Sequence, residues 1–332
     1  MMKIKHLTRA ALLATVAGLA ATAGHAEITL RMATDSGAKG SGPGDTLEAW
    51  AKLIEEGSNG EISVDIFYQN ELGGQQEMFD LLMAGDIDLA LNWPLTSYEP
   101  RMSLLYTPYM FTTWEDAFAA MRPDGWLSDA IGTIYQDQGL TYLGAWPEGF
   151  NGIGTKGGAA TTIADAAQFK VRVPPVTPFT ETVAALGYQT ATIDWGELYS
   201  AIQTGVVDGD AANVIFYDLN YFGDVLTDWT YTRQQFLSGI FTANNESFDE
   251  LSEEHRQLIA DSARELMEAR FEVAQEADTA DVEEWKAKGL NYITLSDEEL
   301  APMMESVREA VWPLMDGLIG ADLMQLVRDN AK

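Results

Sequence analysis

Apolar and polar residues alternate with two different periods along the first hundred positions of the chain. Short runs with a strand pattern occur at residues 28–33, 62–66 and 87–91. Helical spacing separates them: Asp45 is expected to cap a helix before the second run, and Gly73 and Gly74 to open one before the third. Strands that alternate with helices in this way predict an α/β fold with a mainly parallel sheet.

A second unit of the same kind follows. Residues 114–136 have a helical pattern, residues 140–145 a strand pattern, and residues 152–162 are rich in glycine, which suits a crossing between domains. Further strands are predicted over residues 170–173 and 188–192, and further helices over residues 177–186 and 197–204. A charged helical tract from residue 247 to about residue 288 is long enough to run across both units. The pattern predicts two α/β lobes around a cleft that closes over a ligand.

Residues 1–26 have the three parts of a secretory leader. Three basic residues precede an uncharged run over residues 10–23, and Gly24 and Ala26 offer small side chains to a signal peptidase. An uncleaved anchor helix is the alternative, but the run is short and rich in alanine for a membrane span. We therefore expect the mature chain to begin near Glu27, to reside in the periplasm, and to have no stable membrane insertion.

The remaining composition excludes several kinds of chemistry. Without the three basic residues of the leader, 17 Lys and Arg face 51 Asp and Glu, a net charge of −34, which disfavours nucleic acid and anionic lipid as partners. The chain has no cysteine, and beyond the leader its only histidine is His255. A His/Cys zinc site and a Cys–His pair are therefore impossible, and we expect no metal and no cofactor. Paired carboxylates keep a hydrolase or lyase open as an alternative.

Two positions are candidate anion-binding sites. Arg172 lies near the end of the predicted strand over residues 170–173, where its planar guanidinium could bind a carboxylate in the cleft. A surface arginine is the competing interpretation. The glycine pair before Glu77 begins a helix, where free N–H groups favour anions, although a simple helix-initiating turn explains it equally. It matches neither a Walker A motif nor a dinucleotide-binding fingerprint.

Other candidates are neutral or aromatic. Residues 207–213 resemble a calcium loop but lack the glycine and glutamate that an EF-hand requires at its sixth and twelfth positions. Asn213 could instead reach a ligand as a neutral donor. Trp93 and Trp146 each follow a strand-like run and could wall a pocket, although core packing is the alternative for either.

These motifs, taken in their order along the chain, resemble those of a known protein family. From about residue 28 to residue 288 the chain resembles the substrate-binding receptors of tripartite ATP-independent periplasmic (TRAP) transporters, the dicarboxylate-receptor family. The matching stretches are NGEI at residues 59–62, ELGGQQEMFDLLMAGDIDL at 71–89, YTPYMF at 106–111, residues 139–150 ending in Gly149-Phe150, FKVRVP at 169–174, WGELYSAIQTGVVDG at 195–209, and residues 245–256.

The resemblance implies a two-lobed fold with a hinge and a long helix that spans both lobes. It places lobe I at residues 27–150 and about 238–277, and lobe II at residues 151–237 and about 278–332. It implies a small organic anion as ligand, a carboxylate in particular. Its partners would be the small and large TRAP permease subunits, which an ion gradient drives.

The resemblance also implies roles for single residues. Arg172 matches the arginine that binds the ligand carboxylate in the family, and Lys156 aligns loosely with a second cation. The family's Gln-Glu-Asn-Pro is replaced here by residues 210–213, so Asn213 either takes the role of the ligand-contacting asparagine or that contact is lost. The predicted ligand-binding set is Arg172, Asn213, Lys156, Trp93, Glu77, Phe150 and Asp210.

Three other functions stay open at this point. The same hinged architecture serves receptors of ATP-driven importers and of sensor kinases. An extracytoplasmic hydrolase or lyase that uses carboxylates, or a structural envelope protein, are further alternatives. The sequence does not identify the ligand.

Overall fold

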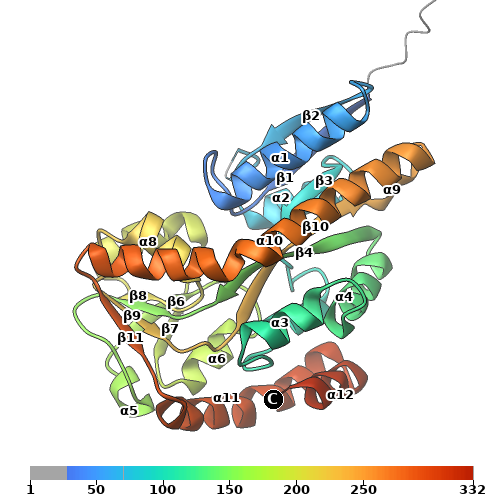
Figure 1. Cartoon of the computed structure of the whole chain (residues 1–332). Coiled ribbons are helices and arrows are strands. Elements are labelled where there is room, and N and C mark those ends of the chain that lie inside the picture. Colours follow the sequence, from blue (N-terminus) through green and yellow to red (C-terminus); the bar gives the residue numbers. More distant parts are fainter. Residues whose placement is uncertain (1–27, 70, 332) are drawn as a thin grey trace, which may run out of the picture.

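The computed structural model describes residues 28–69 and 71–331, so the predicted leader lies outside the described residues. One of its two β-sheets has the strand order β2-β1-β3-β10-β4 (Figure 1). Its strands are β1 (Ile28–Thr34), β2 (Ile62–Phe67), β3 (Leu89–Asn92), β4 (Leu140–Phe150) and β10 (Phe236–Asn244). β1 pairs in parallel with β2 and β3, whereas β10 pairs antiparallel with β3 and β4. This sheet is the centre of the first lobe.

The second sheet has the order β11-β9-β5-β8-β6-β7. Its strands are β5 (Ile153–Thr155), β6 (Lys170–Val173), β7 (Gln189–Thr192), β8 (Gly209–Asp210), β9 (Asp228–Tyr231) and β11 (Asn291–Thr294). β6 lies parallel to both β7 and β8, and β9 lies parallel to β11. Both sheets thus contain parallel strands, as the alternation of strands and helices predicts.

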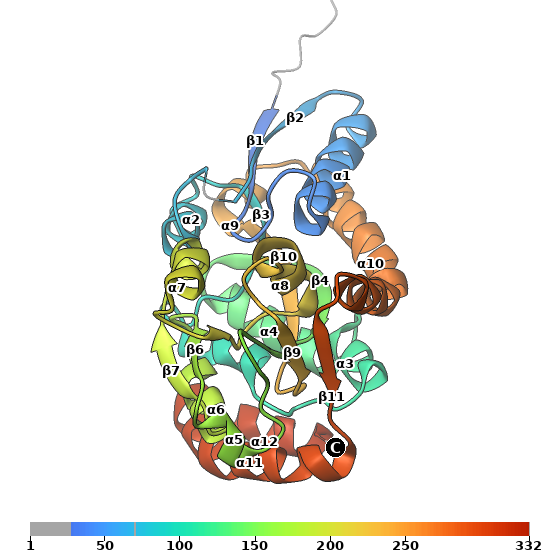
Figure 2. The same cartoon turned by 90° about the vertical axis from the view of Figure 1, so that its left-hand side faces the viewer.

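Helices surround the two sheets. They are α1 (Gly42–Gly57), α2 (Gln75–Met83), α3 (Trp114–Met121), α4 (Trp126–Asp137), α5 (Ile163–Ala166), α6 (Phe179–Ala185), α7 (Leu198–Thr204), α8 (Ile215–Phe222), α9 (Asn245–Asp249), α10 (Glu253–Ala287), α11 (Asp297–Ile319) and α12 (Ala321–Asn330), with 3₁₀ turns η1 (Pro100–Tyr106) and η2 (Trp195–Glu197). In Figure 2 the strands β1 and β2 lie at the opposite end of the molecule from α11 and α12.

Helix α10 runs across both lobes (Figure 1). Its 35 residues give it a length of about 52 Å at 1.5 Å per residue. Near one end, Ser262 accepts a hydrogen bond at 3.1 Å from the indole of Trp50 in α1. Near the other end, the buried Trp285 donates at 2.9 Å to the carbonyl of Asn291 in β11. The expected fold, two α/β lobes with a long spanning helix, is confirmed.

Aromatic rings fill the place where the chain crosses from the first sheet to the second. Phe150 ends β4, and its ring packs edge to face on Trp114 and Phe236. Tyr231, at the end of β9, contacts the same ring. Phe150 is fully buried here, so it joins the cores of the two lobes.

Four local expectations need correction. Ser41 caps α1 in place of Asp45, because Pro43 fits the first turn and the Ser41 hydroxyl accepts from the N–H of Gly44. The helical region over residues 114–136 is two helices, which separate around Pro123. The strand predicted over residues 140–145 continues to Phe150. The glycine-rich stretch 152–162 is not wholly a linker, since it contains strand β5.

Across residues 28–69 and 71–331, no helix combines the length and the apolar character that a membrane span requires.

Candidate functional site

A cavity of about 610 Å³ lies between the two lobes. The first lobe lines it with residues that follow strand ends, Asp35 after β1 and Trp93 after β3. The second lobe lines it with Arg172 on β6 and Asn213 after β8. The carboxyl ends of parallel strands from both sheets therefore meet at this cavity, where α/β proteins bind their ligands.

Arg172 is held in place by the neighbouring strands. It is only 4% exposed, and its register partner on β8 is Asp210. Its Nε donates to the carbonyl of Ile193 at 2.8 Å, and its Nη1 donates to Asp210 Oδ1 at 3.1 Å. Two of its five N–H groups are thus used, and the other three have no partner among residues 28–69 and 71–331. A carboxylate in the cavity could accept from them.

Asp210 supports the arginine and does not line the cavity. It is fully buried, and its Oδ2 accepts from the N–H groups of Ala212 and Asn213 at 3.0 and 3.1 Å. It therefore fixes both Arg172 and the turn that carries Asn213. The glycine before it is required, because a Cβ on Gly209 would lie 1.9 Å from the carbonyl oxygen of Gly154 on β5.

Asn213 is oriented by a second buried acid. Its Nδ2 donates at 2.9 Å to Asp218 Oδ1, and Trp229 Nε1 donates at 3.0 Å to the other oxygen of the same carboxyl group. Burial, assisted by the charge of Asp210, raises the pKa of Asp218 well above its ordinary value. The side-chain Oδ1 of Asn213 has no hydrogen-bond partner among the described residues, so this amide can present an acceptor to the cavity as well as a donor.

Glu148 connects the two walls. It lies on β4 of the first lobe, is 5% exposed, and accepts from Trp93 Nε1 at 2.7 Å and from Tyr217 Oη at 2.6 Å. Tyr217 belongs to α8 of the second lobe. Burial raises the pKa of Glu148 to about 7, against the opposing effects of these two hydrogen bonds and of the Arg270 charge.

Asp35 lies on the first-lobe wall and has weaker partners. Ser36 Oγ donates to its Oδ1 at 3.3 Å, and the N–H of Trp93 donates to its Oδ2 at 3.5 Å. Desolvation raises the pKa of Asp35 to about 7, although hydrogen bonding from the Gln75 side chain acts in the other direction. Asp35 therefore has lone pairs available toward the cavity.

Aromatic side chains form much of the remaining wall. The rings of Tyr106 and Phe179 lie 5.2 Å apart and bring η1 of the first lobe against α6 of the second. Trp195 packs edge to face on Tyr217 at 5.6 Å, and its ring centroid is 5.9 Å from the Arg172 guanidinium carbon. The cavity thus combines a few convergent polar groups with flat apolar surfaces.

The structure distributes the seven predicted residues in two groups. Arg172, Asn213, Trp93 and Glu77 line the cavity, with Glu77 exposed at the start of α2. The other three do not line it: Asp210 supports Arg172, Phe150 is in the core between the lobes, and Lys156 is exposed after β5.

Several wall residues were not predicted from the sequence. Asp35 lies two residues beyond the predicted strand over residues 28–33, so its position near a carboxyl end could have identified it. Glu148 and Tyr217 had no such signal, because the strand was expected to end before Glu148 and helix α8 was not predicted. Trp146, a second candidate for a pocket wall in the sequence, does not line the cavity. Its indole donates to Thr46 Oγ1 at 3.1 Å.

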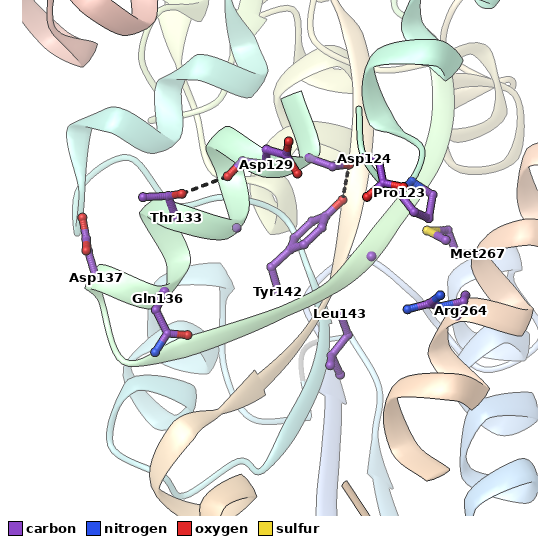
Figure 3. A pocket seen from close by; sticks show the side chains of 13 residues that line it. Pro123, Asp124, Asp129, Thr133, Gln136, Asp137, Tyr142, Leu143, Arg264 and Met267 are labelled. Atoms are coloured by element: carbon purple, nitrogen blue, oxygen red, sulfur yellow. Dashed lines mark hydrogen bonds between the residues drawn. The ribbon is translucent and has the colours of Figure 1, made fainter. Parts of the chain in front are cut away.

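A second hollow of about 520 Å³ lies on the first lobe alone, between α4, the start of β4 and α10 (Figure 3). Tyr142 points toward α4, and its hydroxyl is 2.9 Å from that of Ser128 (Figure 3). Asp124, Asp129 and Asp137 line this hollow with Arg264, but no two sheets converge on it. Its position on one lobe makes it a poorer site for a ligand that closes a hinge.

The described residues do not provide the ligand sets that metal ions require. Within residues 28–69 and 71–331, no group of three or more His, Asp or Glu side chains could hold a metal ion. His255 does not line the cavity, and its Nε2 lies 3.3 Å from Glu61 Oε2.

Comparisons with known proteins agree with this arrangement. Residues 35–315 match the family described as bacterial extracellular solute-binding protein, family 7. The ectoine/5-hydroxyectoine-binding periplasmic protein UehA of Ruegeria pomeroyi is 27% identical over 278 residues, which cover 82% of both chains. A TRAP periplasmic solute-binding protein of Sulfurospirillum deleyianum, solved with bound succinate, is 24% identical with a TM-score of 0.81, covering 92% of this chain and 100% of that one.

One further solved relative carries a hydroxy acid. It is a TRAP periplasmic solute-binding protein of Chromohalobacter salexigens with bound D-glucuronate, 21% identical with a TM-score of 0.81, and the match covers 91% of this chain and 99% of that one.

Proposed function

Because the chain belongs to the bacterial extracellular solute-binding proteins of family 7, we propose that it captures a small organic anion, a carboxylate, in the cavity between its lobes. The chain is a TRAP-type substrate-binding protein, and it delivers its ligand to a TRAP-type membrane transporter. Arg172 carries the proposal for the ligand, since it is buried at the cavity wall and three of its N–H groups have no partner among the described residues.

The ligands of the similar proteins support a carboxylate. Ectoine, succinate and D-glucuronate differ in size and in their other groups, but each has a carboxylate. A guanidinium is suited to this shared group because its planar N–H groups match the two carboxylate oxygens. The chain's acidic surface is unfavourable to an anion at long range, but salt screens that field beyond roughly 10 Å.

Ligand capture would proceed by closure of the two lobes. We keep the predicted division, with lobe I at residues 27–150 and about 238–277 and lobe II at residues 151–237 and about 278–332. Contacts across the cavity, such as the bond between Tyr217 and Glu148, would form when the lobes close. The closed receptor would then dock on the small and large permease subunits from the periplasm, after removal of the leader.

The family and the fold are those of transport solute receptors. We accordingly propose stoichiometric binding without turnover. Incubation of the protein with a bound carboxylate, followed by chromatography, should return the compound unchanged, whereas accumulation of a product would favour the hydrolase or lyase alternative.

The test of the carboxylate site is Arg172→Ala. Removal of one partner from a buried, hydrogen-bonded charge pair costs about 2–5 kcal/mol, so affinity should fall at least ~30-fold. A thermal-shift screen of small carboxylates would supply the ligand, and calorimetry would give its dissociation constant in each variant. Lys52→Ala, which removes an exposed cation on α1, is the matched control for the change in net charge. Unchanged affinity in Arg172→Ala would contradict the assignment.

A further inference from the structure

Opposite charges occupy opposite walls of the cavity. Among the described residues, Arg172 of the second lobe is the single cation that lines the cavity, whereas the first lobe provides three acids, Asp35, Glu77 and Glu148. None of these three acids forms an ion pair within residues 28–69 and 71–331. A fourth acid, Asp194, is exposed on the side of Arg172. A ligand that spans the cavity therefore meets a cation at one end and carboxyl groups at the other.

Of the three acids, Asp35 is the one that is free to bind a ligand. Both oxygens of Glu148 accept short hydrogen bonds, at 2.7 and 2.6 Å. Glu77 Oε2 accepts from the N–H of Gly74 at 3.0 Å and completes the cap of α2 near the surface. Within the part of the chain that the structure describes, Asp35 has only the two long contacts of 3.3 and 3.5 Å and the Gln75 side chain, and it follows the central strand β1.

We propose that the ligand is a zwitterion whose carboxylate binds Arg172 and whose protonated nitrogen binds Asp35 on the opposite wall. This inference rests on the proposed function and narrows its ligand class. A dicarboxylate would place its second negative charge beside Asp35 and Glu148, and these acids would have to take up protons to relieve the Coulomb repulsion. A hydroxyl could donate to Asp35, but unlike a cation it would not stabilise the ionised form of this carboxyl group by charge.

The aromatic wall favours the same class of ligand. Trp93 and Tyr217 line the cavity beside Glu148, and Trp195 lies against Tyr217. The faces of such rings attract a cation within about 6 Å of the ring centre. Aromatic side chains next to carboxyl groups suit an ammonium or amidinium nitrogen.

The test uses compounds that share four carbons and one carboxylate and differ in the terminal group. They are 4-aminobutanoate, 4-hydroxybutanoate, succinate and butanoate, with ectoine and D-glucuronate as a larger zwitterion and a larger hydroxy acid. Calorimetry of the full mature protein should rank 4-aminobutanoate above the other three, and ectoine above D-glucuronate. Tighter binding of succinate or of either hydroxy acid would overturn the zwitterion proposal and leave the carboxylate receptor standing.

Asp35→Asn supplies a second, independent readout. It should weaken the preferred zwitterion at least ~30-fold, while butanoate changes by no more than about threefold. Asp65→Asn, an exposed acid on β2, should leave both affinities unchanged. An equal loss for zwitterion and butanoate would reveal a structural role for Asp35 and would overturn the proposal. If Arg172→Ala leaves the affinity of every binding carboxylate unchanged, the carboxylate receptor itself fails.

Discussion

The hydrogen bond between Tyr217 and Glu148 provides a direct test of lobe closure. Tyr217 lies on α8 of the second lobe and Glu148 on β4 of the first, and both are buried at the cavity. Their 2.6 Å bond can exist only when the lobes are together. Tyr217→Phe removes the hydroxyl and retains the ring that packs on Trp195. The substitution therefore weakens the closed state and leaves the open state unaffected.

The magnitude depends on the charge of Glu148. A hydrogen bond to an ionised group contributes about 1.5–3 kcal/mol, and one between neutral groups about 0.5–1.5 kcal/mol. Burial raises the pKa of Glu148 to about 7, so its carboxyl group is mostly ionised at pH 8 and mostly protonated at pH 6. If tight binding requires closure, the dissociation constant should rise roughly 10- to 150-fold at pH 8 and roughly 2- to 10-fold at pH 6.

Calorimetry at both pH values would measure this, and small-angle X-ray scattering would report whether the ligand still makes the protein more compact. Tyr199→Phe is the matched control, because Tyr199 donates at 2.7 Å to Asp224 and both residues belong to the second lobe. Equal dissociation constants for wild type and Tyr217→Phe, or an equal loss in Tyr199→Phe, would refute the role of this bond in closure.

Two further predictions concern stability. The pKa of Glu148 is about 7 in the native state and 4.5 ordinarily, so between these pH values the native protein holds a proton that the unfolded chain releases. The free energy of unfolding should therefore fall as the pH rises from 4.5 to 7. Urea unfolding of Glu148→Gln should show a smaller fall over the same pH range. Gly209→Ala should lose stability by about 3 kcal/mol or more, because its Cβ would lie 1.9 Å from the Gly154 carbonyl oxygen. Gly317→Ala in α11 meets no atom within 4 Å and should be neutral or stabilising in the same assay, so a similar loss in both would contradict the steric reasoning.

The elements that the sequence predicts well are those with a local signal. The strands over residues 28–33, 62–66 and 170–173 are present, because their apolar residues alternate or lie between clear turn residues. Strand β10 (Phe236–Asn244) was not predicted, since all nine of its residues are buried and it has no alternating face. Helices α11 and α12 were also missed.

The residues of the candidate site can also be separated into those with a local sequence signal and those without one. Arg172 could be identified because it lies near the end of a strand that prolines terminate, which is a local pattern. The role of Asp210 could not, because it depends on the register of β6 against β8, two strands 38 residues apart. The bond between Glu148 and Tyr217 depends on how two lobes meet, and no periodicity in the chain encodes that.

In the proposed role of Arg172 as the carboxylate site, its pairing with Asp210 would help a receptor that must also release its ligand. An unpaired guanidinium in a buried wall would destabilise the ligand-free protein, and Asp210 offsets that charge. Asp210 would also lower the attraction of Arg172 for a ligand carboxylate, because the fixed acid and the ligand would compete for the same guanidinium. Because Asp210 engages only Nη1, the remaining N–H groups still give a carboxylate directional partners. The proposed site would thus have a moderate affinity and would keep its selectivity for a carboxylate group.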